Sequence, residues 1–415
     1  MFATLAQGTR GRSAFLAANS TTGVVGQEDT QFAEDMALEE RWECTLTLIT
    51  MKANKRSRSR TIDVHYHEDE YVSYIDQINY VTQYSASATS LTVDDADKFA
   101  EGDLVQHMDS DEVMLVTASN TSTNVLTVIR DFGQSTESWT AKATTIDDND
   151  YLHNLGNAFE QGHDLPTMKS TTPVERINYC QDIRTPVEAS EVAIATVLRG
   201  PQEWDYQIKK ASKEHMQAIE RSNWFGKPYR GDKGIYASGT GNTAPTTCGG
   251  VNHVIDYYAD SANKVDQDAL TEFEFMDFLE AGMDKGNRTK LFFCPPSLRW
   301  GFDKWGITRQ NTFEKTTVLG MKISAWQSSV GDIIIFTHDL FKADASTYYN
   351  YGFLLDPENL EWVTFSNIGS TQYRSAGDHT STGETKKSGE FQTIQCLLLK
   401  LPNTHARLRY KTITA

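Results

Sequence analysis

The chain has 415 residues, with 39 basic and 56 acidic side chains and a formal net charge of −17. At roughly 100–200 residues per domain this length predicts two or three domains, and the negative charge argues against nucleic acid or an anionic membrane surface as the primary ligand. No apolar run approaches the roughly 18–20 residues that cross a bilayer, and five widely spaced cysteines without a CxxC pair predict reduced thiols made in a cytosol.

The most basic part of the chain lies between residues 52 and 60, where five of nine residues are basic: Lys52, Lys55, Arg56, Arg58 and Arg60. The flanking stretches 45–51 and 61–67 alternate apolar and polar residues, which predicts two paired strands and hence a long hairpin, residues 44–70, with a basic tip. A solvated surface turn is the ordinary interpretation of such a charge run, and it stays open. The alternative is that these five side chains contact an acidic neighbouring subunit.

Residues 85–145 have a different pattern, with four short apolar stretches separated by polar turns. This spacing predicts a small all-β module inserted after the hairpin. The aspartates beside its turns lack the spacing of a calcium loop, so we interpret them as solvated.

The strongest helix signal covers residues 201–225, with Pro201 in the first turn and Gly226 directly after the end. Apolar residues at i, i+4 and i+7 predict one narrow buried stripe, which includes Ile219. His215 lies on the stripe and is expected to be a partly buried, satisfied histidine and not a ligand. Lys210, Lys213 and Glu220 are expected on the polar face.

Residues 255–365 are predicted to form a compact α+β unit. A helix starts at Thr271, which forms a capping box with Glu274. Further signals predict a buried strand at 290–294, a short helix at 296–305, and strands at 333–336, 351–355 and 393–399. The last of these is too apolar to be exposed on both faces and must return to a core made earlier in the chain.

Candidate chemical sites are weak. His65 and His67 lie two residues apart on one predicted strand face, which rarely closes a metal site alone. Cys294 and His338 could form a nucleophile and base only if the fold joined them, so a structural thiol is favoured. The acidic run at 147–150 offers paired carboxylates but has the character of a solvated linker. We predict no catalytic residue, no cofactor and no metal.

The order of segments resembles that of tailed-bacteriophage major capsid proteins of the Hong Kong 97 fold. The resemblance lies in a hairpin that ends with residues 65–70 before an inserted β module, in residues 173–190 leading to the helix opened at 199–201, in the helix exit at 222–226, and in the ending 401–407.

This resemblance implies an α+β fold of the Hong Kong 97 type with an N-terminal arm, an extended β-hairpin loop, an inserted small all-β domain, a peripheral domain and an axial domain. The implied limits are 1–43 for the arm, 44–70 for the loop, 85–145 for the inserted domain, 155–250 with 366–415 for the peripheral domain, whose spine helix is 201–225, and 251–365 for the axial domain.

The resemblance also implies self-assembly as hexamers and pentamers into an icosahedral head that encloses double-stranded DNA without sequence-specific binding. The implied partners are other copies of the chain, a scaffold, a portal and decoration proteins, with no membrane. The protein would be made in the host bacterial cytoplasm and end in the virion. Two alternatives stay open: another virion structural or adhesion protein, and a carbohydrate-active hydrolase with a β accessory module.

Overall fold

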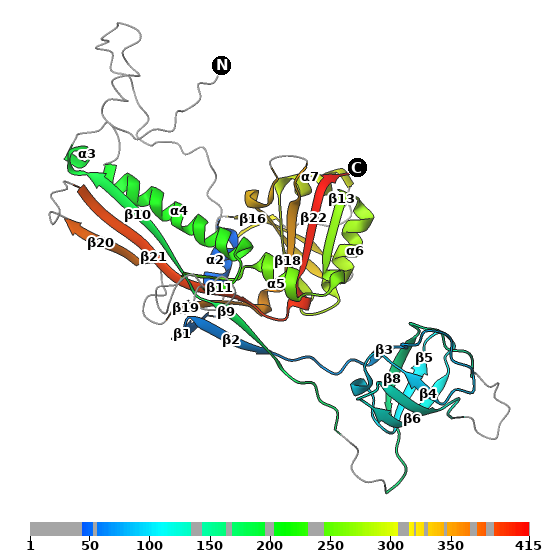
Figure 1. The fold of residues 1–415 in the computed structure, drawn as a ribbon. Coiled ribbons are helices and arrows are strands. Elements are labelled where there is room, and N and C mark those ends of the chain that lie inside the picture. Colours follow the sequence, from blue (N-terminus) through cyan, green and yellow to red (C-terminus); the bar gives the residue numbers. More distant parts are fainter. Residues whose placement is uncertain are drawn as a thin grey trace.

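The computed structural model describes residues 44–52, 56–133, 143–162, 168–195, 203–230, 245–305, 315–318, 321–327, 331–343, 347–365, 372–378 and 386–414. These residues form an α+β fold in three parts (Figure 1): a seven-stranded sheet with helices on both faces, a long sheet beside a long helix, and a β module at the end of a narrow arm. Within these residues, no helix has both the length and the apolar character needed to cross a membrane.

The seven-stranded sheet is mixed. Its order is β13 (Lys264–Leu270), β22 (Ala406–Ile413), β18 (Asn350–Leu355), β14 (Thr289–Cys294), β17 (Asp332–Thr337), β16 (Met321–Gln327) and β15 (Lys315–Val318). The central strand β14 runs parallel to β17 and antiparallel to β18. Both of its faces are covered, which explains the continuous apolar run that predicted a buried strand at 290–294.

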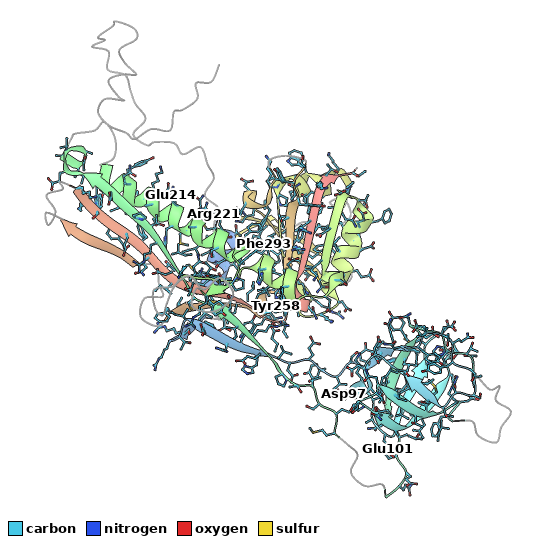
Figure 2. All side chains as sticks on the ribbon, viewed as in Figure 1. Asp97, Glu101, Glu214, Arg221, Tyr258 and Phe293 are labelled. Carbon is cyan, nitrogen blue, oxygen red and sulfur yellow. The ribbon has the colours of Figure 1, made fainter. Side chains whose placement is uncertain are left out.

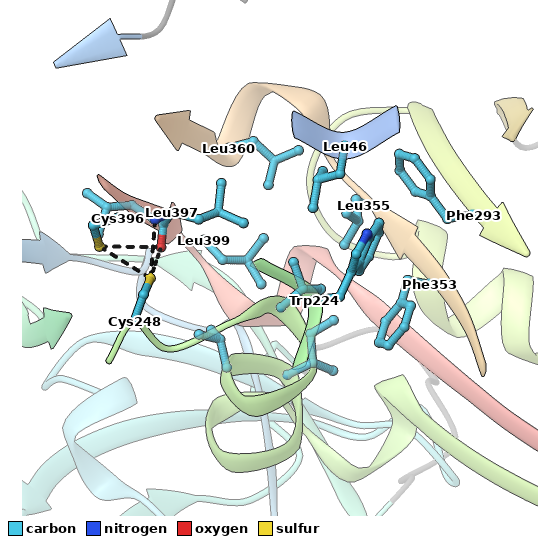
Figure 3. Packing of buried hydrophobic residues seen from close by; sticks show 14 of the residues in the cluster. Leu46, Trp224, Cys248, Phe293, Phe353, Leu355, Leu360, Cys396, Leu397 and Leu399 are labelled. Atoms are coloured by element: carbon cyan, nitrogen blue, oxygen red, sulfur yellow. Dashed lines mark hydrogen bonds between the residues drawn. The ribbon is translucent and has the colours of Figure 1, made fainter. Parts of the chain in front are cut away.

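Helices cover both faces of this sheet. On one face, α6 (Glu272–Met283) and α7 (Pro296–Trp305) share a core cluster with Phe292 of β14. On the other face, α5 (Val251–Tyr258) and the end of α4 (Glu203–Phe225) pack around Trp224 and Phe293 (Figure 3), whose ring centroids are 4.9 Å apart. The predicted capping box of Thr271 and Glu274 is confirmed at the start of α6.

The long sheet has the order β1 (Arg56–Ser59), β19 (Leu360–Phe365), β21 (Lys386–Leu399) and β10 (Gln181–Ser190), with β20 (Gln372–Asp378) also paired to β21. Helix α4 lies along β10, and Trp204 and Ala211 share a cluster with Val187 and Phe391. The predicted stripe is therefore confirmed. Strand β21 makes the predicted return to an earlier core, since it pairs with β10 and β19. Residues 196–202, which hold the predicted first turn at Pro201, are outside the described part.

The remaining short elements connect these parts. They are α3 (Glu191–Ala195), β11 (Tyr229–Arg230), β12 (Thr246–Thr247) and the 3₁₀ turns Ala96–Lys98, Ser261–Asn263, Asp339–Phe341, Pro357–Asn359 and Pro402–Thr404.

The predicted hairpin of residues 44–70 is wrong, because its first half is a helix. Thr45–Lys52 forms α2, although its alternating β-branched residues have the pattern of a strand. Local preference is overridden here by tertiary contacts: the first amides of α2 bind a carboxylate of α4, and Leu46 is fully buried in the main core.

The true partner of the predicted second strand lies far along the chain. Strand β2 (Asp63–Glu68) pairs antiparallel with β9 (Val174–Tyr179), so His65 lies opposite Ile177. These two strands form the arm in Figure 1, and the chain between them forms the β module at its far end.

The module is a six-stranded sheet that closes on itself. Its order is β3 (Ile75–Gln77), β8 (Tyr151–Asn157), β5 (Asp103–His107), β6 (Val113–Asn120), β7 (Val125–Ile129) and β4 (Ser90–Thr92). A bridge between Ile78 and Val93 joins the two edge strands. The all-β character was predicted, but β3 and β8 lie outside the predicted limits 85–145, because neither has a strong alternating pattern.

The end of the chain differs from the grouping of residues 366–415. Strand β21 lies in the long sheet, whereas β22 lies between β13 and β18 in the seven-stranded sheet. The turn at Leu401, with a left-handed φ of 51°, takes the chain from one sheet to the other. The domain limits themselves stay a prediction.

Candidate assembly surfaces

A buried carboxylate joins three elements of the body. Glu220 of α4 is only 1% exposed, so its predicted place on the polar face is wrong. Its Oε1 accepts hydrogen bonds from Leu46 N (2.9 Å), Trp224 Nε1 (2.9 Å) and His338 Nε2 (3.2 Å). Its Oε2 accepts bonds from Thr47 N (2.8 Å) and Thr47 Oγ1 (2.5 Å). Glu220 therefore links α2 and the turn after β17 to α4.

The environment of Glu220 keeps it ionised. Burial alone would raise its pKa, but the bonds from His338 and Thr47 outweigh burial and hold the pKa below its ordinary value. The negative charge sits at the start of α2, where unpaired amides and the helix dipole favour it. Sequence analysis missed this residue, although its spacing of four residues from Trp224 places the two on one helical face.

A second polar contact fixes α4 on the long sheet. His215 is fully buried, and its Nδ1 and Nε2 lie 2.9 Å from the hydroxyls of Thr185 in β10 and Thr393 in β21. Burial lowers the pKa of His215. The prediction of a satisfied histidine is confirmed, but His215 is buried fully and not partly.

The module-side end of the arm is held on the body by paired charges. Glu68 at the end of β2 forms an ion pair with Arg176 of β9, and its other oxygen accepts a bond from Leu401 N (2.7 Å). The guanidinium of Arg176 lies 4.1 Å from the ring centre of Tyr258, which Figure 2 labels. These contacts connect both strands of the arm to α5 and to the turn before β22.

Several apolar side chains along the arm and just before it are exposed to solvent. Val174 is 53% exposed, Ile177 is 43% exposed and Ile62 is 37% exposed. A two-stranded ribbon is marginally stable by itself, and among the described strands β2 and β9 pair with each other alone. One side of the ribbon packs on the body through Tyr66 and Asn178, so the exposed aliphatic side chains are left for another surface.

The predicted basic contact residues do not lie at a hairpin tip. Lys52 is the last residue of α2, Lys55 is outside the described residues, and Arg56 begins β1. Arg58 lies on β1, which pairs parallel with β19, and Arg60 follows in a bend. Both Arg58 and Arg60 are exposed at the edge of the long sheet, close in sequence to the start of the arm.

The candidate chemical groups have structural partners. His65 Nδ1 contacts Glu175 at 2.6 Å, whereas His67 is exposed. Cys294 is fully buried in β14, and burial raises its pKa to about 12, as expected of a structural thiol. His338 N donates to Cys294 O, but its ring bonds Glu220 instead of the sulfur.

Across the described ranges, no group of three or more His, Cys, Asp or Glu side chains is arranged to hold a metal ion. Asp150 of the predicted acidic linker contacts His107 Nε2 at 3.0 Å inside the module. All five cysteines are buried thiols outside disulfides, and the sulfurs of Cys248 and Cys396 lie 3.7 Å apart (Figure 3).

Comparison with known proteins gives one family over most of the chain. Residues 52–412 match the family model described as SU10 major capsid protein. The major capsid protein of Pseudomonas phage PaMx41 is 26% identical over 270 residues, which cover 62% of this chain and 61% of that protein. The match therefore spans about three fifths of the relative's length.

The chain is also similar to solved structures of a capsid and of an encapsulin, at TM-scores below 0.5. The capsid of a native GTA particle has 9% identity and a TM-score of 0.45, with 94% of this chain and 96% of that chain covered. The SrpI encapsulin of Synechococcus elongatus PCC 7942 has 11% identity and a TM-score of 0.41, with 57% of this chain and 76% of that chain covered.

Proposed function

The chain belongs to the SU10 major capsid protein family, and we propose that it self-assembles as hexamers and pentamers into the icosahedral head of a tailed phage, around double-stranded DNA. The observation that carries this proposal is the extent of the family match. It runs from residue 52 to residue 412 and so includes the arm, the module and nearly all of both large sheets. A structural protein of the virion is favoured over a hydrolase for the same reason.

We further propose a Hong Kong 97-type assignment of the parts. Helix α4 and the long sheet would form the peripheral domain, and the seven-stranded sheet with α5, α6 and α7 the axial domain. The paired strands β2 and β9 would form the extended loop, with the β module as an insertion at its tip. Residues 1–43 would be the N-terminal arm of that fold, a segment different from the arm formed by β2 and β9. Compared with the limits inferred from sequence, this moves α2 and β1 out of the loop and β9 into it, and it exchanges β19 and β22 between the axial and peripheral domains.

The arm supports assembly by its own physical chemistry. A ribbon of two six-residue strands with exposed aliphatic side chains gains stability when a neighbouring subunit covers it. The contacts of Glu68 and Arg176 with each other and with Leu401 hold the arm in place before it meets that neighbour. Orientation in advance lowers the entropic cost of forming the contact.

The charge of the chain suits a container for DNA. DNA adheres to a protein when cationic side chains neutralise its phosphates and release their counterions. A chain with a net charge of −17 favours few such contacts, so the shell encloses the genome without adhering to it. The basic residues near 52–60 are then available for contacts between acidic subunits. Such a contact is heterologous and can repeat around a ring.

The same proposal assigns the remaining partners and the location. A scaffold and a portal would set the size and origin of the shell, and decoration proteins could bind its outside. The chain would be made in the bacterial cytoplasm and carried in the virion.

Assembly of the purified chain tests the proposal. Under assembly conditions we expect closed particles or rings in electron micrographs, with hexamers and pentamers resolved by averaging. A chain that stays monomeric, and binds only to preformed heads, would be a decoration or adhesion protein. Cleavage of glycans without particle formation would favour the hydrolase.

Charge reversal tests the basic contact residues. We expect Arg58→Glu with Arg60→Glu to leave the melting temperature of the unassembled chain unchanged, because both side chains are exposed. Particle yield should fall severely, because like charges would then face each other at the contact. The matched control is Lys304→Glu with Lys342→Glu, a reversal of two other exposed lysines. Equal particle yields from both variants would make the segment a solvated surface.

A further inference from the structure

The outer face of the β module has an unusual composition. Along β5, β6 and β7, the inward side chains form the core of the module, so the alternate positions point outward. These outward residues are Leu104, Gln106, Val113, Leu115, Thr127 and Ile129. None of them carries a charge. Leu104 is the register partner of Leu115, which in turn pairs with Ile129, so three aliphatic side chains form one row across three strands.

Strand β8 extends this face. It pairs with β5, and its outward residues Tyr151 and Leu155 are 51% and 48% exposed. Ile129 at the other end of the row is 48% exposed. The arm holds the module away from the body (Figure 1), so the two large sheets and their helices, as far as the structure describes them, do not cover the module. We call this surface, on β8, β5, β6 and β7, the apolar face.

The lack of charge contrasts with the rest of the module. Residues 75–157 contain 14 acidic and three basic residues, a net charge of −11 out of −17 for the whole chain. Three of the acidic groups, Asp76, Asp103 and Glu112, are buried and paired with basic side chains. Exposed acidic residues are concentrated in the turns at the strand ends, such as Glu101, which Figure 2 labels.

An uncharged, apolar centre inside an acidic rim is the composition of a protein interface. The rim decides between occupants. Two modules placed face to face would bring two acidic rims together, which repel. A partner with basic residues around apolar ones fits instead. The described part of this chain offers such a surface at the start of the arm, where Arg58, Arg60, Ile62 and Ile177 are all exposed.

We propose that the apolar face of one subunit docks on residues 56–62 and the base of the arm of a second copy of the chain. This inference rests on the proposed shell function and adds the identity of the two surfaces. Leu115 lies at the centre of the contact and meets apolar side chains near Ile62. The acidic turns around it meet Arg58 and Arg60.

Photo-crosslinking in assembled particles tests the contact. A benzoylphenylalanine is placed at Leu115 in the full-length chain, and light- and heavy-isotope chains are mixed before assembly so that crosslinks between copies are distinguished by mass. We expect crosslinks between copies to peptides that contain residues 56–62, and none in the unassembled chain. The matched control places the probe at Ser122, in the exposed turn between β6 and β7, where such crosslinks should be at least tenfold fewer.

Two further variants make the result decisive. Leu115→Glu should reduce particle yield at least tenfold while Ser122→Glu does not, and the melting temperature of each unassembled variant reports whether the module is folded. Arg58→Glu with Arg60→Glu should remove the crosslink from Leu115 in any particles that still form. Particles in which Leu115 links to another module, to its own chain or to no protein would overturn this inference but leave the shell function intact. A wild-type chain that forms no particles would overturn both.

Discussion

Replacement of Glu220 by alanine tests the buried node between α2, α4 and the turn after β17. The substitution removes an ionised acceptor that serves the backbone amides of Leu46 and Thr47 and the side chains of Thr47, Trp224 and His338. Because the site is 1% exposed, water does not readily replace the lost carboxylate. The donors are left buried and unpaired.

The size of the effect follows from these donors. An unsatisfied buried donor costs roughly 1–3 kcal/mol, and several donors lose the same acceptor here. We therefore expect Glu220→Ala to lower the free energy of unfolding by about 3–5 kcal/mol. Glu220→Gln keeps the side-chain volume but turns an NH₂ group toward some of the donors. We therefore expect it to lower the free energy of unfolding by a smaller amount.

Urea denaturation of the unassembled chain measures this loss. The control is Lys213→Ala on the exposed side of the same helix, which should stay within about 0.5 kcal/mol of the wild type. If Glu220→Ala unfolds at the wild-type midpoint, the node carries no stability and the reasoning from burial is refuted.

The same node has a predictable dependence on pH. The pKa of Glu220 is lowered in the folded chain relative to its ordinary value of 4.5. A carboxyl group with a depressed pKa contributes full stability above 4.5, and the contribution is lost as the pH falls toward the folded pKa. The difference in stability between wild type and Glu220→Ala should therefore shrink below pH 4.5. A constant difference down to acid unfolding would contradict the assignment of an ionised carboxylate.

Three other substitutions test buried features of the fold. Burial lowers the pKa of His405 from 6.5 to about 4. As the pH falls, the unfolded chain therefore binds a proton at His405 before the folded chain does, and the free energy of unfolding should fall by up to about 3 kcal/mol between pH 6.5 and 4. In urea titrations, His405→Gln should flatten this dependence on pH. The ammonium of Lys290 binds the carbonyls of Gly282, Lys285 and Thr404 at 2.5–2.7 Å. Lys290→Met leaves these carbonyls without a donor and should lower the free energy of unfolding, measured in urea, by at least about 3 kcal/mol. Gly102→Ala should lower the melting temperature of the module, because Gly102 has a φ of +87° and an added Cβ would lie 2.3 Å from the Phe159 ring. The control Ser122→Ala should leave the melting temperature unchanged.

The sequence predicts the elements whose local and tertiary preferences agree. The capping residues Thr271 and Glu274 set the start of α6, and the spacing of Trp204, Ala211 and Ile219 identifies the buried side of α4. The central strands are equally clear, because a strand covered on both faces must be apolar throughout. In these segments, residues within a few positions of one another along the chain are enough to predict the element.

The failures have the opposite cause. Residues 45–52 alternate like a strand, but the helix there is fixed by a carboxylate 174 positions away from Leu46. The arm strand β2 pairs with residues more than 100 positions later. Neither contact leaves a local pattern in the sequence. The node residue Glu220 was missed because a charge on a helix is ordinarily solvated, and only the distant donors explain its burial.

The apolar face depends on both kinds of information. The alternation along β5, β6 and β7 is visible in sequence, but it indicates only that one side of each strand is buried in the module core. The uncharged character of the other side becomes clear once Leu104, Leu115 and Ile129 are placed in one row. A solvent-facing row without charge, in a module of net charge −11, is costly for a monomer and useful at a contact.

The position of the two charged regions relative to the arm has a consequence for association. The acidic module and the basic residues near 56–60 lie at opposite ends of the arm, and six-residue strands span about 20 Å. β2 ends at Glu68, whose contacts with Arg176 and Leu401 hold that end of the arm on the body, and residues 69–74 lead from there toward the module. A contact between the module of one copy and the basic residues of another, as proposed above, is head-to-tail. Association of this kind closes into a ring when its rotation closes and otherwise continues.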